Sequence, residues 1–397
     1  MKKFFSSDPK LLGYGFLILF FASYGQTFFI SLFNENIRQY YKISDGEFGL
    51  IYSVATTLSS LILVSFAKLI DYIDLRLYSF LICIGLSLSC FGMFIFYNNI
   101  FYLFLIIFAL RFFGQGAMSH AGETTMVRYF GKNRGKAISV STLGGMIGVT
   151  ILPLIVVKLS KNFGDQNVWL LSSLSMVVFI PLMFLILNNH RDRHTNFIDN
   201  LKNNHLSKKW KTKEVLLDSK FYVYLPLSLA APFISTGLMF HQIFIINQKN
   251  WSFEMLGTGY IFLGIFSIIG LLVGGPIIDK FDTKRTALTS LFPLLVGVIV
   301  LLFFESYIFL IIYMSFYGLN LGLSTPLIGA LWAEIYGLES LGVVKALLHA
   351  SMVLASALSP LIFGYLIDWG FGILTIVTIS ICIILFSTLL PLYKQLP

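Results

Sequence analysis

Long apolar runs separated by short polar segments organise the chain. Each run is about 20 residues long, which is the length an α-helix needs to cross a hydrocarbon core of roughly 30 Å. The runs are continuously apolar rather than alternating, and this favours helices over the strands of a membrane β-barrel. The pattern predicts an all-α membrane protein with twelve transmembrane helices. The expected spans are 11–33, 48–69, 78–97, 101–127, 137–157, 167–187, 221–247, 255–278, 286–304, 307–330, 343–367 and 371–392.

One long polar segment interrupts this pattern between the sixth and seventh spans, with eight Lys or Arg residues from Arg191 to Lys220. We expect it to be a solvated cytoplasmic linker with a short amphipathic piece on the membrane surface, rather than a regulatory or nucleic-acid site. It divides the chain into an N-terminal six-helix bundle (1–188), a basic linker (189–220) and a C-terminal six-helix bundle (221–397).

The two halves repeat each other at an offset near 207 residues. The repeat is visible in the polar loop residues and in the Gly and Pro positions rather than in the apolar runs. The segment Ala67–Arg76 matches Gly275–Arg285. Three further matches pair Arg128–Gly131 with Glu334–Gly337, Gly135 with Gly342 and Pro153 with Pro360. Two similar six-span halves are typical of transporters in which one bundle rocks against the other around a central site.

The repeated segment also carries a family resemblance. The chain resembles the major facilitator superfamily, whose loop between spans two and three follows the pattern G-x-L-a-D-r-x-G-r-r. The first copy here has Ala67, Leu69, Asp71 and Arg76 in that pattern, and the second keeps Gly275, Asp279 and Lys284. Locally, Tyr129–Gly148 is similar to the entry of the fifth span in monocarboxylate-porter-like members. The resemblance implies a twelve-helix transporter that works by alternating access.

Composition and charge agree with a membrane protein and set its orientation. Hydrophobic residues make up 57% of the chain and charged residues 12%, whereas a soluble protein needs about 25% charge. With the N-terminus in the cytoplasm, 22 of the 28 Lys and Arg residues fall on the cytoplasmic side, five fall outside and Arg111 lies within a span. The net charge of +9 is then explained by topology and lipid headgroups, so no nucleic-acid partner is expected. Short loops favour a bacterial inner membrane with both termini cytoplasmic.

Catalytic and cofactor motifs are not apparent. The three cysteines, Cys83, Cys90 and Cys382, all fall within spans, where they act as small apolar residues. No nucleotide-binding glycine loop, catalytic triad or metal-ligand spacing stands out. We therefore expect no enzyme activity, no cofactor, no metal and a monomeric protein.

Arg111 is the main candidate for a cargo contact, because a charge at bilayer depth is costly and usually faces a cavity or a partner. It lies about 15 Å from the start of span four, with Gln115 and Ser119 on the same α-helical face. Its planar fork of donors suits a carboxylate. The alternative is a structural arginine that bonds to carbonyl groups of a neighbouring span. No Asp or Glu lies in the middle third of any span, which favours an anionic cargo over a cationic one.

The family resemblance implies that spans one, four, seven and ten line the cavity. The polar residues that it nominates for substrate binding are Gln26, Thr27, Arg111, Gln115, His241, Gln242, Tyr317 and Asn320. Each of them alone could equally be an interhelical hydrogen bond. For proton coupling, histidine suits neutral pH, and the candidates in order are His241, Glu123 and His349.

A cytoplasmic gate is expected at the repeated loops and the matching ends of spans four and ten. Pairs between acids and bases there would close the inner face and break when it opens. Its candidate residues are Asp71, Arg76, Arg128, Asp279, Lys284, Arg285 and Glu334.

The sequence thus predicts a secondary transporter that moves a small, monocarboxylate-like organic anion with a proton. Two alternatives stay open: an exporter of apolar or cationic compounds, and a membrane receptor or scaffold that keeps the fold without transport.

Overall fold

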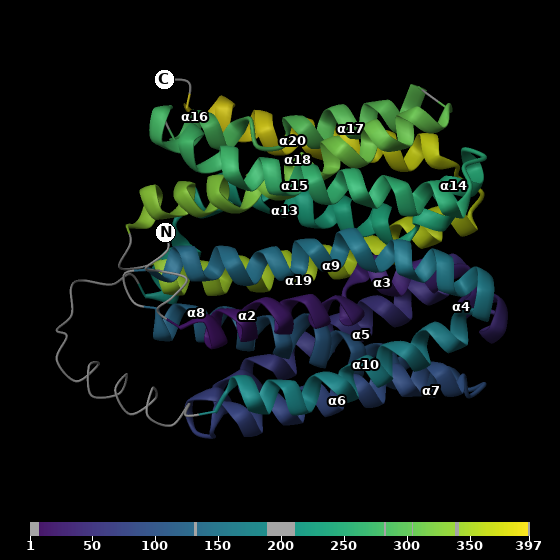
Figure 1. Cartoon of the computed structure of the whole chain (residues 1–397). Coiled ribbons are helices and arrows are strands. Elements are labelled where there is room, and N and C mark those ends of the chain that lie inside the picture. Colours follow the sequence, from purple (N-terminus) through teal and green to yellow (C-terminus); the bar gives the residue numbers. More distant parts are fainter. Residues whose placement is uncertain are drawn as a thin grey trace. The chain divides into compact units, whose positions relative to one another are not determined.

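The structure is a computed structural model that describes residues 8–130, 133–188, 211–281, 283–303, 305–337 and 341–395 (Figure 1). Every regular element in those residues is a helix, which confirms the all-α prediction. Eleven of the helices are long and apolar enough to cross a membrane. A bent pair, Pro9–Gly25 and Thr27–Tyr41, brings the number to twelve if it forms one span.

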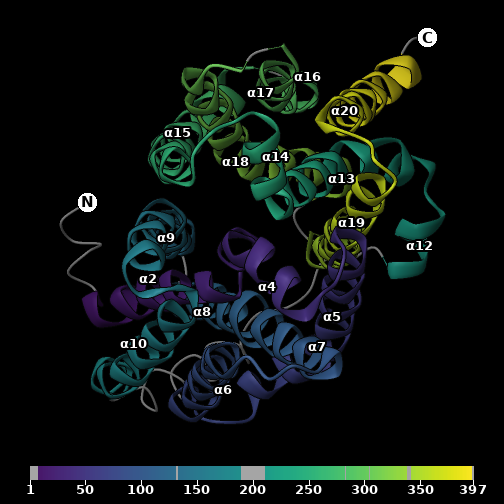
Figure 2. The ribbon, with the colours of Figure 1, turned by 90° about the vertical axis from the view of Figure 1, so that its right-hand side faces the viewer.

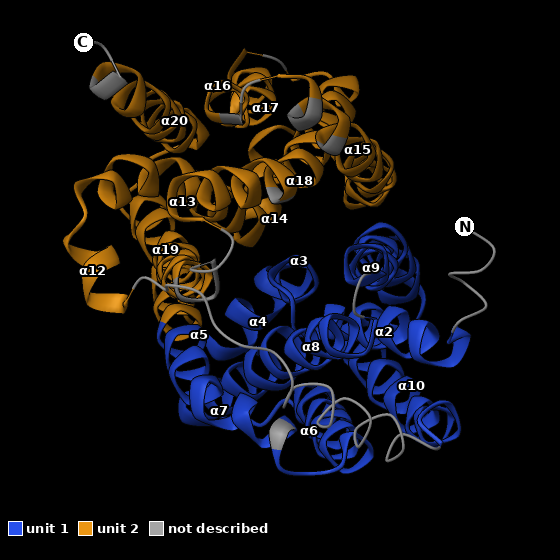
Figure 3. Cartoon of the chain, turned by 90° about the vertical axis from the view of Figure 1, so that its left-hand side faces the viewer, with its two compact units in different colours: residues 1–42, 54–205 blue, residues 43–53, 206–397 orange. Residues whose placement is uncertain are grey.

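The chain folds into two compact units (Figure 3). Unit 1 comprises Met1–Lys42 and Val54–His205, and unit 2 comprises Ile43–Ser53 and Leu206–Pro397. Most of the predicted linker, 189–220, lies outside the described residues, so the predicted domain boundaries stay a prediction. The start of helix α5 belongs to unit 2, while its remainder belongs to unit 1.

Unit 1 is built around two close helix pairs, α2 with α9 and α6 with α10, which lie side by side in both views (Figures 1 and 2). Its elements are α2 (Pro9–Ala22), η1 (Ser23–Gly25), α3 (Thr27–Ile30), η2 (Ser31–Phe33), α4 (Asn34–Tyr41), α5 (Asp45–Phe66), η3 (Ala67–Asp71), α6 (Leu75–Ile95), α7 (Ile100–Ala109), η4 (Leu110–Met118), α8 (Ser119–Tyr129), α9 (Arg134–Phe163) and α10 (Asp165–Ile186).

Unit 2 is dominated by the pairs α15 with α18 and α13 with α19. Its elements, besides the start of α5, are α12 (Thr212–Leu217), α13 (Ser219–Phe240), α14 (Gln242–Gln248), α15 (Phe253–Lys280), α16 (Thr283–Leu288), α17 (Phe292–Phe303), α18 (Tyr307–Tyr336), α19 (Leu341–Asp368) and α20 (Ile373–Gln395).

Local sequence explains where many of these helices begin. Asp8 caps α2 by accepting a hydrogen bond from the Leu11 amide, and Pro9 follows in the first helical turn, where its missing N–H is no loss. Asp74, Asn99 and Asp218 cap α6, α7 and α13 in the same way. The apolar runs then supply helices whose backbone groups bond within the segment, as a hydrocarbon environment requires.

The first span of each half differs from the continuous helix that the sequence predicts. The run 11–33 is interrupted by η1 and by Gln26, which has an extended backbone (φ −82°, ψ 154°). The run 221–247 is interrupted at His241 (φ −98°, ψ 24°) between α13 and α14. An apolar window detects length and hydrophobicity but not a local break of the backbone. Interrupted spans in corresponding halves are a feature of transporter binding sites.

Glycines allow the closest helix contacts within each unit. In unit 1, a Cβ atom on Gly114 of η4 would lie 2.6 Å from the Cα atom of Gly25 in η1. In unit 2, a Cβ atom on Gly318 of α18 would overlap the carbonyl oxygen of Leu263 in α15. Backbones therefore touch directly at these crossings, as is common for small residues in membrane helices.

We predict that Gly114→Ala destabilises the protein, because the added methyl group overlaps backbone atoms of Gly25 and not a flexible side chain. The expected loss is about 1–3 kcal/mol, measured by thermal unfolding of the purified protein in detergent. Gly13→Ala is the matched control, since a Cβ atom on Gly13 of α2 has no heavy atom within 4 Å. Equal melting temperatures for the two variants would contradict the proposed backbone contact.

Candidate functional site

Arg111 lies where the fourth span changes from α-helix to π-helix at η4 (Leu110–Met118). Its side chain is almost fully buried, with 1% of the residue exposed. Its Nε atom donates to the Thr56 hydroxyl at 3.1 Å, and its Nη1 atom donates to the Gly25 carbonyl at 2.9 Å and the Thr27 hydroxyl at 3.5 Å. The guanidinium therefore links the fourth span to α5 and to the broken first span, all within unit 1.

The two irregular segments, η1 with Gln26 and η4, meet at this guanidinium. The Gly25 carbonyl lies at the break of the first span, where Arg111 supplies a donor. A π-helical turn inside an α-helix is uncommon and is frequently found at functional sites. Unit 1 thus contains a buried cation at the junction of two interrupted helices, with the interhelical contacts expected of a structural arginine. Its contact with cargo stays a prediction.

The sequence predicts Arg111 and Gln115 on one face by α-helical spacing, whereas Leu110–Met118 is a π-helix. The predicted polar stripe stays a prediction. Gln115, Gln26 and Thr27 are half-buried, and Glu123 is exposed on α8. The structure brings Thr27 to Arg111 by a hydrogen bond.

In unit 2, two of the nominated cargo residues make hydrogen bonds to neighbouring elements, Gln242 to α15 and Asn320 to the turn between α16 and α17. The Gln242 side-chain oxygen accepts from the Tyr260 hydroxyl at 2.6 Å. The Asn320 amide donates to the carbonyl of Ser290 at 2.8 Å. These contacts favour an interhelical role for both, which is the alternative that the sequence leaves open.

A small cavity in unit 2 touches two of the nominated residues, Gln242 and Tyr317. Aliphatic, methionine and tyrosine side chains make up the rest of its wall. The lining residues are Leu238, Met239, Gln242, Ile245, Ile246, Leu256, Leu310, Tyr313, Met314 and Tyr317. The Tyr317 hydroxyl lies 3.8 Å from the Met239 sulfur. Such a wall suits an apolar group better than a charged one.

His241 lies at the break between α13 and α14 and is buried, with 2% of the residue exposed. Its Nε2 atom is 3.0 Å from the Pro360 carbonyl oxygen, and its Nδ1 atom is 3.5 Å from a carboxylate oxygen of Asp45. The two other proton-coupling candidates, Glu123 and His349, are exposed. Among the three, His241 is the one that the structure places in a buried polar cluster.

Four of the expected gate residues, Arg76, Arg128, Lys284 and Glu334, make polar contacts within their own unit in the described part of the chain. Arg76 pairs with Asp74, the cap of its own helix, at 3.1 Å. Arg128 donates to the Ile70 carbonyl at 3.3 Å. Lys284 and Glu334 in unit 2 form an exposed ion pair at 3.8 Å. The side chains of Asp71 and Asp279 lie outside the described ones, and Arg285 is exposed.

The sequence did not point to three residues that the structure brings to these sites. The Thr56 hydroxyl accepts a hydrogen bond from Arg111. The Asp45 carboxylate faces His241, and the Asp368 carboxylate accepts a hydrogen bond from the Asp45 amide. Asp45 and Asp368 stand at the ends of apolar runs, where they resemble ordinary helix-end acids. Among the described residues, no group of three or more His, Cys, Asp or Glu side chains is placed to hold a metal ion.

Taken together, a multi-pass helical membrane protein with two units and an interrupted first span in each half is of the transporter class. The family model of the Major Facilitator Superfamily matches residues 15–271 and 221–396. The chain therefore belongs to the Major Facilitator Superfamily, as its repeated loop motif suggested. No curated protein matches the chain by sequence.

Solved structures agree with this fold. The chain is similar to a bacterial homologue of the human lysosomal transporter Spinster in its inward-facing, unoccupied conformation, with a TM-score of 0.67 and 12% identity. The same homologue in its inward-facing, occupied conformation gives a TM-score of 0.68 and 13% identity. In each case the alignment covers 96% of this chain and 94% of the other. At this identity the similarity supports the fold.

The structural role of Arg111 can be tested by Arg111→Lys. A lysine keeps the charge, but its single ammonium cannot bond to both Thr56 and the Gly25 carbonyl as the guanidinium does. Loss of one hydrogen bond to a charged group should destabilise the protein by about 2 kcal/mol in thermal unfolding. Thr56→Val, which removes only the Nε partner, should cost less. An unchanged melting temperature for Arg111→Lys would mean that the guanidinium does not hold the broken span.

Proposed function

We propose that the protein is a secondary transporter that moves a small organic anion, such as a monocarboxylate, by alternating access with protons as the coupling ion. The single observation that carries this proposal is the buried guanidinium of Arg111 at the junction of two interrupted helices. Neutral oxygen atoms of Thr56, Gly25 and Thr27 orient it, and a carboxylate is the group that a planar guanidinium binds best. Arg111 then serves both the fold of unit 1 and the cargo.

The wider setting follows from charge and family. The excess of Lys and Arg on one side supports an N-terminus and a C-terminus in the cytoplasm, and the short loops support a bacterial inner membrane. The partners in this proposal are the cargo, protons and membrane lipids, and the protein acts as a monomer. Its chemistry is binding and movement of cargo, with no catalytic step.

One observation favours a second candidate, the export of an apolar or cationic compound. The small cavity of unit 2 has a largely aliphatic and aromatic wall with two methionines, Met239 and Met314. Methionine and aromatic side chains adapt to apolar groups and to ring systems.

Counterflow in proteoliposomes separates them. The protein is reconstituted with either an unlabelled carboxylate or the unlabelled lipophilic cation inside, and uptake of the corresponding labelled carboxylate or cationic dye is followed against protein-free liposomes. Exchange of the carboxylate supports the proposal, and exchange of the dye alone supports the second candidate. If neither is exchanged, a receptor or scaffold role for this fold is favoured.

We predict that Arg111→Gln lowers carboxylate counterflow at least about 30-fold, because a hydrogen bond to a charged group contributes about 1.5–3 kcal/mol and the variant loses the charge as well. Gln115→Leu is a second variant that leaves Arg111 in place, and a smaller loss is expected if Gln115 faces the cargo. Both variants are compared at equal amounts of reconstituted, monodisperse protein. Normal carboxylate affinity in Arg111→Gln would assign Arg111 to the fold alone.

A further inference from the structure

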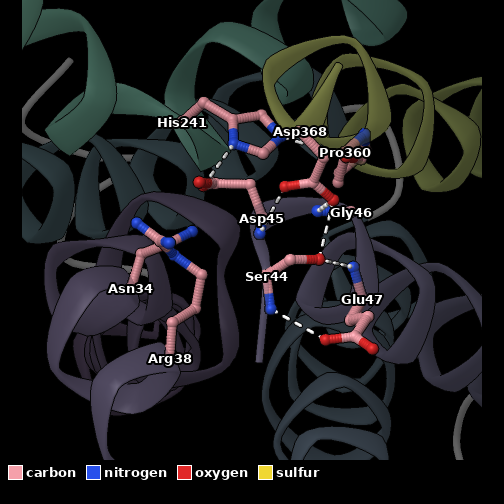
Figure 4. A network of polar contacts seen from close by, with 9 residues as sticks. All are labelled: Asn34, Arg38, Ser44, Asp45, Gly46, Glu47, His241, Pro360 and Asp368. Atoms are coloured by element: carbon pink, nitrogen blue, oxygen red, sulfur yellow. Dashed lines mark hydrogen bonds and ion pairs between the residues drawn. The ribbon is translucent and has the colours of Figure 1, made fainter. Parts of the chain in front are cut away.

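The N-terminus of α5 is capped by a residue that is more than 300 positions away in the sequence. Ser44 and Glu47 form a capping box, in which the Ser44 amide donates to the Glu47 carboxylate at 2.8 Å and the Glu47 amide donates to the Ser44 hydroxyl at 3.1 Å. The next two amides, of Asp45 and Gly46, donate to the Asp368 carboxylate at 3.1 Å and 2.9 Å (Figure 4). The Ser44 hydroxyl donates to the same carboxylate at 2.7 Å.

This arrangement gives Asp368 the role of an external cap. Amides at a helix N-terminus have no partner within the helix, and a negative charge is favourable there. Asp368 is the last residue of α19, so one side chain joins the end of α19 to the start of α5. All these residues belong to unit 2, whereas α5 continues into unit 1 from Val54.

Glycines let the two helices meet closely enough for this contact. A Cβ atom on Gly46 would lie 2.5 Å from the Asp368 carboxylate. A Cβ atom on Gly364 of α19 would lie 2.6 Å from the Asp45 carbonyl oxygen. Further along α5, the Ser53 hydroxyl donates to the carbonyl of Ala357 in α19. The start of α5 is therefore fitted along α19 for more than two turns.

His241 adds a titratable group to the same contact (Figure 4). The Pro360 carbonyl oxygen can only accept, so the Nε2 atom 3.0 Å away must carry a hydrogen. In a neutral ring the Nδ1 atom would then carry a lone pair and no hydrogen. It lies 3.5 Å from the Asp45 carboxylate, so two hydrogen-bond acceptors would face each other. Nδ1 is buried and has no hydrogen-bond partner in this arrangement. A second proton on the ring turns this opposition into a charge-assisted donor.

Further groups of unit 2 lie around the ring. The Phe240 ring packs edge-on against the imidazole at 5.0 Å. Asp45 is the carboxylate that faces the ring from α5. The Asp368 carboxylate of α19 accepts a hydrogen bond from the Asp45 backbone amide. The further charged groups on these elements are Glu47, held in the capping box, and Lys249, buried after α14.

We propose that a proton-operated contact, the α5 latch, holds the start of α5 on α13 and α19. The residues of the α5 latch are Ser44, Asp45, Gly46, His241, Pro360 and Asp368. The latch is engaged when His241 carries two ring protons, and it releases α5 when His241 loses one. This proposal rests on the proposed function, since alternating access needs such contacts to form and break, and it places one proton-sensing step at His241. In the proposed orientation the latch lies at the external ends of these helices.

Cysteine labelling tests the latch on the full chain. Ser53→Cys is a near-isosteric reporter on the buried face of α5, in a background where Cys83, Cys90 and Cys382 are replaced by Ala. The protein is held in lipid nanodiscs without cargo and labelled with a membrane-impermeant maleimide. Each rate is divided by the rate of a cysteine at the exposed position Tyr97, which removes the intrinsic effect of pH on thiol reactivity.

With His241 present, the normalised rate should be about tenfold higher near pH 8 than near pH 5.5, the range in which histidine changes its charge. In His241→Gln this ratio should fall to about one. His349→Gln, which changes an exposed histidine of α19, is the matched control and should keep the tenfold ratio. Asp368→Asn should raise the rate at both pH values, because the helix start loses its charged cap.

Asp45→Asn gives an independent test that a merely structural role for His241 would not reproduce. The amide of the new asparagine can donate to the neutral Nδ1 atom, so the latch should stay engaged and labelling should stay slow at both pH values. A tenfold ratio that persists in His241→Gln, or labelling of the parent that does not depend on pH, would overturn the proposal. If His241→Gln does not fold, Asp45→Asn decides: slow labelling at both pH values supports the latch, and an unchanged tenfold ratio overturns it.

The outcome is separable from the cargo proposal. The labelling needs no cargo, so a pH ratio that depends on His241 supports the latch even if carboxylate counterflow is absent. Counterflow that depends on Arg111, without any effect of His241 on labelling, supports the cargo proposal and overturns the latch.

Discussion

A backbone carbonyl at bilayer depth has no water to bond with, so a break in a membrane helix needs a donor from elsewhere in the protein. In unit 1 that donor is Arg111, whose guanidinium reaches the Gly25 carbonyl at the break of the first span. The same requirement explains why a charge can remain buried there, since it is held by oxygen atoms from two neighbouring helices. The proposed cargo site depends on this arrangement, because the Gly25 carbonyl and the Thr27 hydroxyl of the broken span help to orient the guanidinium.

Close backbone contact is the second constraint. Gly25 against Gly114 in unit 1, and Gly46 against Asp368 in unit 2, bring polar backbone atoms within reach of a partner from another helix. Helices in lipid associate through van der Waals packing and hydrogen bonds rather than through a hydrophobic driving force, so such close contacts contribute to the specificity of helix pairing. The two polar clusters, around Arg111 and around His241, both lie where glycine allows two helices to touch.

Most of the fold was accessible from hydrophobicity, because a membrane leaves a helical chain few alternatives. Run lengths gave the helices, and the repeated loop at Asp71 and Asp279 gave the family. The breaks at Gln26 and His241 were missed because both positions lie inside long apolar runs, and the π-helix at Leu110–Met118 has no signature in residue type.

The site was only partly accessible. Arg111 stood out as a charge within a span, but its partners Thr56 and Gly25 follow from how distant segments pack. Gln242 and Asn320 were nominated for cargo, and their bonds to Tyr260 and Ser290 show that a polar residue in a span often serves a neighbouring helix. The contact of Asp368 with the start of α5 joins residues from opposite halves of the chain, and no local pattern encodes it.

The assignment of Ile43–Ser53 to unit 2 has a consequence for how the chain can be divided. A cut in the polar linker would give a C-terminal fragment that lacks these eleven residues, although it folds around them in the intact chain. At the end of α19, Asp368 would then lack the backbone amides of Asp45 and Gly46, and Gly364 would lack the backbone of α5 that packs against it. The two halves are related by sequence repetition, but the compact unit of the C-terminal half is complete only with a segment that the N-terminal half supplies.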